Sequence, residues 1–333
     1  MNTPDSSFMD AHDELAVLLR WKRNYVDPIL SGLTVVPDFH ANGIRLDWLL
    51  RLVLSKSRGR REPNFKEIEY ALNGGLAKAG ILHMEDPIED LLCDSLATGA
   101  GNFRIFPGQW ESATAFTQVV IEAFETLPSA RRKDDTLHVV HALLRLSEEI
   151  ARRADLDRTT ESGGIPQGSM PLPHSAALKR LARLVTFSAR DLATLEIDPN
   201  ALAPFILDEA QLGLIGSREV GETPLEFHPL LAVGNELVVV SPSNVSLAVR
   251  AVIVNAVLQG GLGDLFHVRL LEAQERYAEA TAFWPASHIN LSPPDQDFLR
   301  ASVCEYDRGR FLHVIQLPCA FNGFPAEGYM TTR

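Results

Sequence analysis

The sequence has few cysteines, no long apolar run and no segment that is predicted to be a secretory signal. Its three cysteines, Cys93, Cys304 and Cys319, are far apart and odd in number, so neither a disulfide framework nor a zinc-binding spacing is predicted. The longest apolar stretch, residues 245–258, is interrupted by an arginine and an asparagine and is too short to cross a bilayer. The N-terminus lacks a basic region followed by an apolar core, which excludes a secretory signal. Together these absences indicate a cytoplasmic protein.

The signatures of several enzyme classes are also missing. The patterns G-x-S-x-G and H-E-x-x-H do not occur. One common kind of metal-dependent nuclease needs a carboxylate that holds the metal and, two residues later on the same strand, a lysine that steadies the attacking water. No lysine of this chain follows an acidic residue at that spacing; the lysines are Lys22, Lys56, Lys66, Lys78, Lys133 and Lys179. The sequence therefore shows none of these catalytic signatures and no evident cofactor, which favours a non-catalytic chain and leaves its catalytic residues unknown.

Two glycine-rich segments do not alter that prediction. Residues 163–169 contain three glycines but lack the lysine that a phosphate-binding loop requires. Residues 260–264 follow a helical pattern rather than a strand, so they do not match a dinucleotide-binding fingerprint. Both segments are typical of linkers or helix ends.

Length and charge limit the classes of protein that remain. At 333 residues the chain is long enough for two domains. Its content of 46% hydrophobic and 22% charged residues is typical of a globular protein with a core. The formal net charge of −12 argues against attraction of the whole surface to nucleic acid or to anionic lipid. Any contact with nucleic acid would therefore depend on a local basic patch.

Helical periodicity dominates residues 1–157, which are predicted to form an all-helical domain. Residues 158–173 are rich in glycine, proline, serine and threonine without periodicity, and this composition predicts a linker. The second domain is predicted to span residues 174–333. The helices predicted in the first domain cover residues 8–25, 46–54, 64–79, 88–97, 112–126 and 135–154.

The second domain mixes helical and strand patterns. Gly234 and Asn235 separate two strand patterns and suit a tight hairpin turn, and Ser188 is a predicted helix N-cap. The helices are predicted at residues 174–184, 188–197, 241–258 and 264–283, and the strands at 225–233, 236–240, 302–306 and 311–317. The whole chain is therefore predicted to be α+β, with a helical N-terminal domain followed by a mixed or antiparallel sheet with covering helices.

The last strand pattern, residues 311–317, is apolar at odd and even positions alike. This pattern is typical of a strand that has neighbours on both sides, yet residues 318–333 contain no further strand pattern. We therefore expect the α+β domain to be incomplete at its C-terminus. A protein partner or a continuation of the chain would complete it, with Phe311 and His313 as contact residues.

A second predicted contact with a partner is the loop of residues 99–110. It combines turn residues with large apolar side chains, among them Phe103, Phe106 and Trp110. Such side chains are either tucked against the core or exposed for a partner.

One cluster has a spacing suited to metal binding. On a helix, His138 and His141 would lie on adjoining surface, with Asp134 one turn before His138. These nitrogen and oxygen ligands would suit one divalent metal, and the chain would then be a metal-dependent hydrolase. The alternative is structural, because acidic residues favour a helix N-terminus and His141 borders an apolar face.

Two basic clusters are candidates for contact with nucleic-acid phosphates despite the acidic total. No aromatic residue interleaves the first cluster, so the sequence does not predict base stacking there. The candidate residues are Lys56, Arg58, Arg60, Arg61 and Lys66 in the first cluster and Arg131, Arg132 and Lys133 in the second. The alternative is that these short basic segments are merely solvated.

Three functions follow from these observations. The first is a non-catalytic interaction or regulatory region of a larger cytoplasmic assembly or a longer protein. The second is a nucleic-acid-processing protein that holds phosphates through its basic loops, with catalysis elsewhere. The third is the metal-dependent hydrolase.

Overall fold

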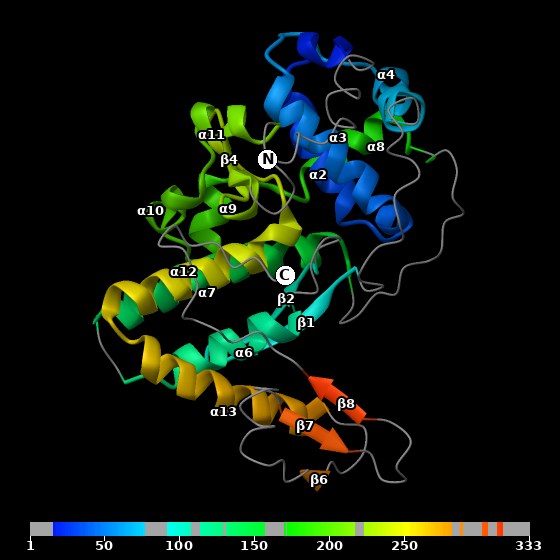
Figure 1. The fold of residues 1–333 in the computed structure, drawn as a ribbon. Coiled ribbons are helices and arrows are strands. Elements are labelled where there is room, and N and C mark those ends of the chain that lie inside the picture. Colours follow the sequence, from blue (N-terminus) through cyan, green and yellow to red (C-terminus); the bar gives the residue numbers. More distant parts are fainter. Residues whose placement is uncertain are drawn as a thin grey trace, which may run out of the picture. The chain divides into compact units, whose positions relative to one another are not determined.

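The computed structural model describes residues 16–76, 92–107, 114–128, 131–156, 170, 172–216, 223–281, 287–288, 302–305 and 312–315. These residues are mostly helical and form three small sheets (Figure 1). None of the described helices combines the length and the apolar character needed to cross a bilayer. The α-helices are α2 (Arg23–Thr34), α3 (Gly43–Lys56), α4 (Phe65–Tyr70), α6 (Thr114–Glu125), α7 (Arg131–Arg153), α8 (Ser175–Ala182), α9 (Ala189–Thr194), α10 (Pro199–Leu202), α11 (Glu209–Leu214), α12 (Val245–Gly260) and α13 (Gly263–Thr281).

The strands are short, and β3 pairs with a strand far along the chain. They are β1 (Asp94–Thr98), β2 (Gly101–Ile105), β3 (Thr186–Ser188), β4 (Leu230–Val233), β5 (Glu236–Val239), β6 (Ser287–His288), β7 (Ser302–Glu305) and β8 (Leu312–Ile315). The sheet orders are β1-β2, β3-β5-β4 and β6-β7-β8. The second and third sheets are antiparallel throughout. Together with the helices, these sheets confirm the predicted α+β class.

The chain divides into two compact units, each built from several segments. Unit 1 comprises Met1–Leu96, Asn102–Thr114 and His141–Val249, and unit 2 comprises Ala97–Gly101, Ala115–Val140 and Arg250–Arg333. The boundaries fall within β1, β2, α6, α7 and α12. Most of the predicted linker, residues 158–173, lies outside the described residues, and the division into domains at that point stays a prediction.

Helix α2 packs against both α3 and α8 in unit 1 (Figure 1). Helix α2 buries nearly every residue from Val26 to Leu33, including Pro28, and the hydroxyl of Ser31 donates to the carbonyl of Val240 at 2.7 Å. The predicted helix over residues 8–25 is wrong in its last part, because residues 16–20 form a 3-10 turn and α2 begins only at Arg23. Backbone pairing of Trp21 with Arg61 separates the two segments.

The sheet β3-β5-β4 lies in unit 1. The turn between β4 and β5 consists of Gly234 and Asn235, as predicted, with Val233 opposite Glu236. Gly234 has a φ of +61°, which places glycine at the first central position of the turn, where a positive φ favours it. The predicted strand over residues 225–233 is wrong in its first half. Pro224 opens a 3-10 turn there, and the strand begins only at Leu230.

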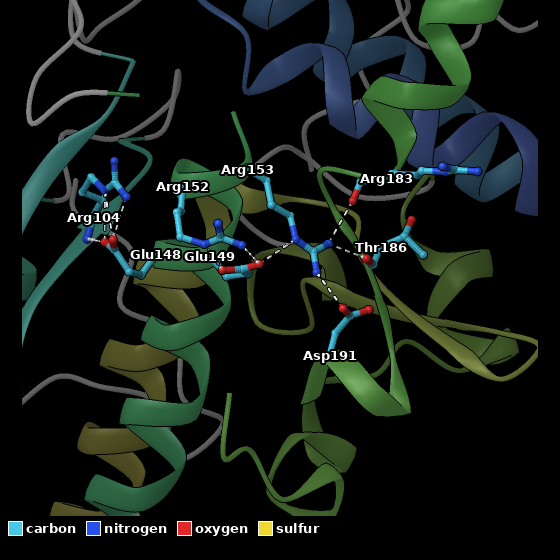
Figure 2. A network of polar contacts seen from close by, with 8 residues as sticks. All are labelled: Arg104, Glu148, Glu149, Arg152, Arg153, Arg183, Thr186 and Asp191. Atoms are coloured by element: carbon cyan, nitrogen blue, oxygen red, sulfur yellow. Dashed lines mark hydrogen bonds and ion pairs between the residues drawn. The ribbon is translucent and has the colours of Figure 1, made fainter. Parts of the chain in front are cut away.

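Helix α7 holds other elements of unit 1 through its arginines (Figure 2). Arg153 donates from Nη1 to the carbonyls of Thr186 (2.7 Å) and Arg183 (2.9 Å), and its guanidinium lies 4.4 Å from the ring centroid of Phe187. Its Nε donates to Glu149 at 2.8 Å. Because the guanidinium of Arg153 binds carbonyls at the end of α8 and in β3, it connects α8 and the β3-β5-β4 sheet to α7.

Unit 2 contains α6, α13 and the larger part of α12. The rings of Phe124 on α6 and Phe266 on α13 meet edge to face at 6.5 Å, and Arg276 donates to Glu122 at 2.6 Å. Gly261 ends α12 with a φ of +63°, so the glycine break that the sequence predicts there is confirmed.

The predicted helix at residues 88–97 is wrong at residues 94–97; residues 88–91 lie outside the described residues. Residues 94–98 form β1 and pair with β2, so the first 157 residues are not all helical. The strands are short, and Leu96, Phe103 and Ile105 alternate as their buried side chains. Gly101, the first residue of β2, has a φ of +132°, which favours glycine.

Strand β8 pairs with β7, and His313 lies opposite Cys304. Within the described ranges no strand lies on the other edge of β8. The predicted completion of this sheet by a partner or by a continuation of the chain stays a prediction.

Candidate nucleic-acid interface

The first basic cluster lies beside the N-terminus of α2. The backbone of Arg61 accepts from Lys22 N at 2.7 Å and donates to Arg20 O at 3.1 Å. Gly59 permits this close approach, because a Cβ at that position would lie 2.0 Å from Arg20 O. Residues 56–61 are therefore fixed by backbone contacts along residues 20–22, and the cluster is an ordered feature of unit 1.

A second segment that the sequence analysis missed joins this cluster. Helix α8 packs on α2, and Lys179 of α8 lies close enough to Glu62 to lower the pKa of that carboxyl, although its hydrogen bond with Lys22 is the main cause. Exposed basic side chains from three separate segments thus share one surface. We call this surface the basic face; its residues are Arg20, Lys22, Arg58, Arg60, Arg61, Lys66, Lys179 and Arg180.

Carboxylates near the basic face are already engaged. Lys22 binds Glu62 at 2.8 Å, and Arg61 binds Glu67. In the part of the chain that the structure describes, Lys66 and Lys179 form no ion pair or side-chain hydrogen bond. The ammonium groups of Lys66 and Lys179 are therefore available to an anion. Lys56, in contrast, is only half-exposed.

A groove of about 700 Å³ opens beside Lys66 and Lys179. Its floor includes the buried Ile68 and Leu178, and its walls include the half-buried rings of Tyr25 and Phe65. We call it the α4–α8 groove. Aromatic residues therefore do accompany this cluster, although none lies within residues 56–61. Tyr25 and Phe65 come from α2 and α4 and are brought to the same groove only by the fold.

The second basic cluster, residues 131–133, differs from the first. Lys133 Nζ donates to the carbonyls of Glu125 and Leu127 at the end of α6, so this lysine caps a helix C-terminus. Arg132 is exposed, and the side chain of Arg131 lies outside the described residues. This cluster belongs to unit 2, whereas the basic face belongs to unit 1.

The structure does not assemble the predicted metal ligands. Asp134 and His138 are exposed, and the ring of His141 stacks on Phe103 with centroids 6.2 Å apart. No group of three or more histidine, cysteine, aspartate or glutamate side chains among the described residues is arranged to hold a metal ion. His141 thus packs against an aromatic ring, and metal binding by these three residues stays a prediction.

The residues predicted to contact a partner fall in different places. Phe103 and Phe106 are 8% and 3% exposed, so both rings are tucked into the core and neither offers surface to a partner. Trp110 and Phe311 lie outside the described residues. The backbone of His313 is in β8.

A buried ionic network in unit 1 has no counterpart among the sequence patterns. Arg51 donates to Asp47 at 2.6 Å, to Glu226 at 2.9 Å and to the hydroxyl of Thr223 at 3.1 Å. Burial alone would lower the pKa of Arg51, but the two carboxylates raise it, so the guanidinium remains charged. No signal in the sequence pairs residues on α3 with residue 226, because the contact spans most of unit 1.

Burial shifts the pKa of two other ionisable groups. Neither carboxylate oxygen of Asp27 has a hydrogen-bond partner among the described residues, and burial raises the pKa of this carboxyl well above its ordinary range, against the opposing charges of Arg23 and Arg58. Burial also raises the pKa of Cys93 to about 12. Its thiol is therefore protonated at neutral pH and is not a nucleophile.

The comparison with protein families identifies the chain more specifically than its motifs do. Residues 5–332 match the family described as "Upx-like: Anti-phage protein Upx-like". Neither a curated protein nor a solved structure gives a significant match. Because the match covers nearly the whole chain, the protein belongs to the Upx-like family of anti-phage defence proteins.

Proposed function

We propose that the chain is a recognition component of anti-phage defence, which binds the phosphate backbone of nucleic acid through the basic face of unit 1. The observation that carries this proposal is that the neighbouring segments 20–22, 58–66 and 179–180 carry exposed basic side chains, of which Lys66 and Lys179 line one groove. Phosphate binding by such a surface is driven by release of counterions and needs no catalytic group.

The acidic total does not oppose this function. At physiological salt the Debye length is about 8 Å, so charges on distant parts of the molecule are screened from a bound strand. Lys66 and Lys179 have no carboxylate partner among the described residues, whereas Glu62 and Glu67 are neutralised by Lys22 and Arg61. The local field at the basic face is therefore positive.

Removal of two exposed charges tests this proposal. We expect the double substitution Arg60→Ala and Arg180→Ala to weaken binding of a labelled oligonucleotide. The slope of log K against log salt should fall by about two, since each lost phosphate contact removes about one. Fluorescence anisotropy titrations between low and physiological salt measure this slope. Neither side chain forms a hydrogen bond or an ion pair with the described residues, so thermal stability should not change.

The control is charge-matched. Arg152→Ala combined with Arg190→Ala removes two exposed arginines that are not part of the basic face and should leave the slope unchanged. An equal loss in the control pair would show that net charge, rather than this face, governs binding. Absence of any binding at low salt would reject the proposal.

A second candidate function is supported by the position of β8. This strand pairs with β7 along one edge, and no other described strand occupies its second edge. An open edge is a template for strand addition by another chain. We therefore also propose a non-catalytic interaction region that docks a protein partner at β8.

This second proposal predicts self-association or exposed apolar surface in the isolated chain. Size-exclusion chromatography with light scattering should give either a mass above that of one chain or a monomer that binds a hydrophobic dye. A monomer of 36.7 kDa without dye binding would contradict it.

A further inference from the structure

We propose that the α4–α8 groove is a binding site for an unpaired base of single-stranded nucleic acid. The base would stack on Phe65 or Tyr25, and the two flanking phosphates would contact Lys66 and Lys179. The proposal rests on the proposed function of the basic face, since it assigns the class of nucleic acid that this face binds.

The walls of the groove have the chemistry that a base requires. Phe65 and Tyr25 both line the groove and are half-buried, so part of each ring faces the open space. The apolar floor includes Ile68 and Leu178, which are 1% and 2% exposed. Every base has a π-face, and stacking on an aromatic side chain holds it without reading its sequence. A volume of about 700 Å³ is within the range of sites for small organic groups.

The aromatic side chains are held in place before any ligand binds. Phe65 is the first residue of α4, and the preceding Asn64 forms a reciprocal capping box with Glu67. Tyr25 lies in the first turn of α2, where its backbone N–H donates to Lys22 O at 3.0 Å. Because both backbones are fixed, binding would cost little additional ordering of the protein.

The rim of the groove has the charge that a backbone requires. Lys66 is on α4 and Lys179 is on α8, so the two ammonium groups belong to different elements bordering the groove. Ser175 and Ala176 also line it, which places the N-terminal end of α8 at the same rim. The partial positive charge of that helix end adds to the two lysines.

The combination of aromatic rings and lysines at the groove favours binding of a single strand over binding of a duplex. In a duplex the base faces are stacked on one another and are not free to contact Phe65 or Tyr25. The phosphates remain accessible in both forms, so the basic face alone would bind either. Base-dependent affinity is therefore the property that distinguishes the groove from a general basic surface.

The experiment uses three probes with the intact chain. They are a single-stranded oligothymidylate, an oligomer of the same length with abasic sites, and a duplex. We expect oligothymidylate to bind about tenfold more tightly than the abasic oligomer, as stacking of one base provides. Phe65→Leu combined with Tyr25→Leu should remove that difference and leave the affinity for the abasic oligomer unchanged. Lys66→Ala combined with Lys179→Ala should weaken binding of all three probes.

The outcomes separate this inference from the proposed function. Equal binding of the three probes, unaffected by the aromatic substitutions, would overturn the groove as a base site and leave phosphate binding intact. No binding of any probe would reject both. Binding of thymidine monophosphate as tightly as the oligomer would make the groove a pocket for a free nucleotide and would also overturn the inference.

A measurement on the unaltered chain covers the case in which the aromatic variants fail to fold. Photocrosslinking with a 5-iodouracil-substituted single strand should label Phe65 or Tyr25, which mass spectrometry of the digested chain identifies. Crosslinks confined to residues outside the groove would contradict the inference.

Discussion

Replacement of Arg51 by alanine is expected to lower the free energy of unfolding by about 3–5 kcal/mol, because it leaves two carboxylates buried without their cation. The side chains of Arg51 and Glu226 are 2% and 4% exposed, and that of Asp47 is 12% exposed. The hydroxyl of Thr223 also contacts Glu226, but it cannot neutralise a charge. Urea denaturation followed by circular dichroism measures the loss.

Two further variants show whether the loss comes from buried charge. Arg152→Ala breaks an ion pair with Glu149 at 2.6 Å whose arginine is 66% exposed, and it should cost only about 0–1 kcal/mol. Arg51→Met combined with Asp47→Leu and Glu226→Leu removes all three charges and should recover most of the lost stability. A triple variant as unstable as Arg51→Ala would show that lost packing, rather than unpaired charge, is the cause.

The network also connects stability with the candidate interface. Arg51 lies on α3, and the basic loop of residues 57–61 follows directly from the end of that helix. Arg58 Nη1 donates to the carbonyls of Leu54 and Ser57 at 3.1 and 2.9 Å, so the loop is held against the helix end. Fixing α3 to residue 226 therefore helps to fix the loop that presents part of the basic face.

Local signals in the sequence predicted local structure well. Ser188 caps α9 with Asp191 in a reciprocal capping box, because both partners lie within four residues of each other. Gly234 and Asn235 form the predicted turn between β4 and β5, because a two-residue turn also depends only on neighbouring residues. The basic loop of residues 56–61 was also visible, since its charges are contiguous in the sequence.

Contacts between distant segments could not be predicted in the same way. Lys179 and Tyr25 carry no individual signal of function, and they reach the groove only because α2 and α8 pack together. The prediction of a helix at residues 88–97 is wrong at residues 94–97, because pairing of β1 with β2 outweighed the local helix propensity there. The candidate site is thus a tertiary feature, of which the sequence showed one of three segments.

The close packing of α2 on α8 makes Gly32 the second position with a large expected effect. A Cβ on Gly32 would lie 2.3 Å from the carbonyl oxygen of Leu181 and 2.6 Å from its carbonyl carbon. These are backbone atoms of α8, so no side chain can rotate away to relieve the overlap. We expect Gly32→Ala to lower the free energy of unfolding by about 3 kcal/mol, the upper end of the usual cost of overpacking.

Gly213→Ala is the matched control for this substitution. Gly213 lies in α11, and a Cβ at that position would have no other atom within 4 Å. Alanine should therefore raise the free energy of unfolding by about 0.5–1 kcal/mol through its higher helix propensity, and thermal melting of the two variants should show shifts of opposite sign. Because α8 carries Lys179, Gly32→Ala should also weaken oligonucleotide binding under conditions in which it remains folded, whereas Gly213→Ala should not. A Gly32→Ala variant with unchanged stability and binding would show that α2 and α8 do not approach as closely as the groove requires.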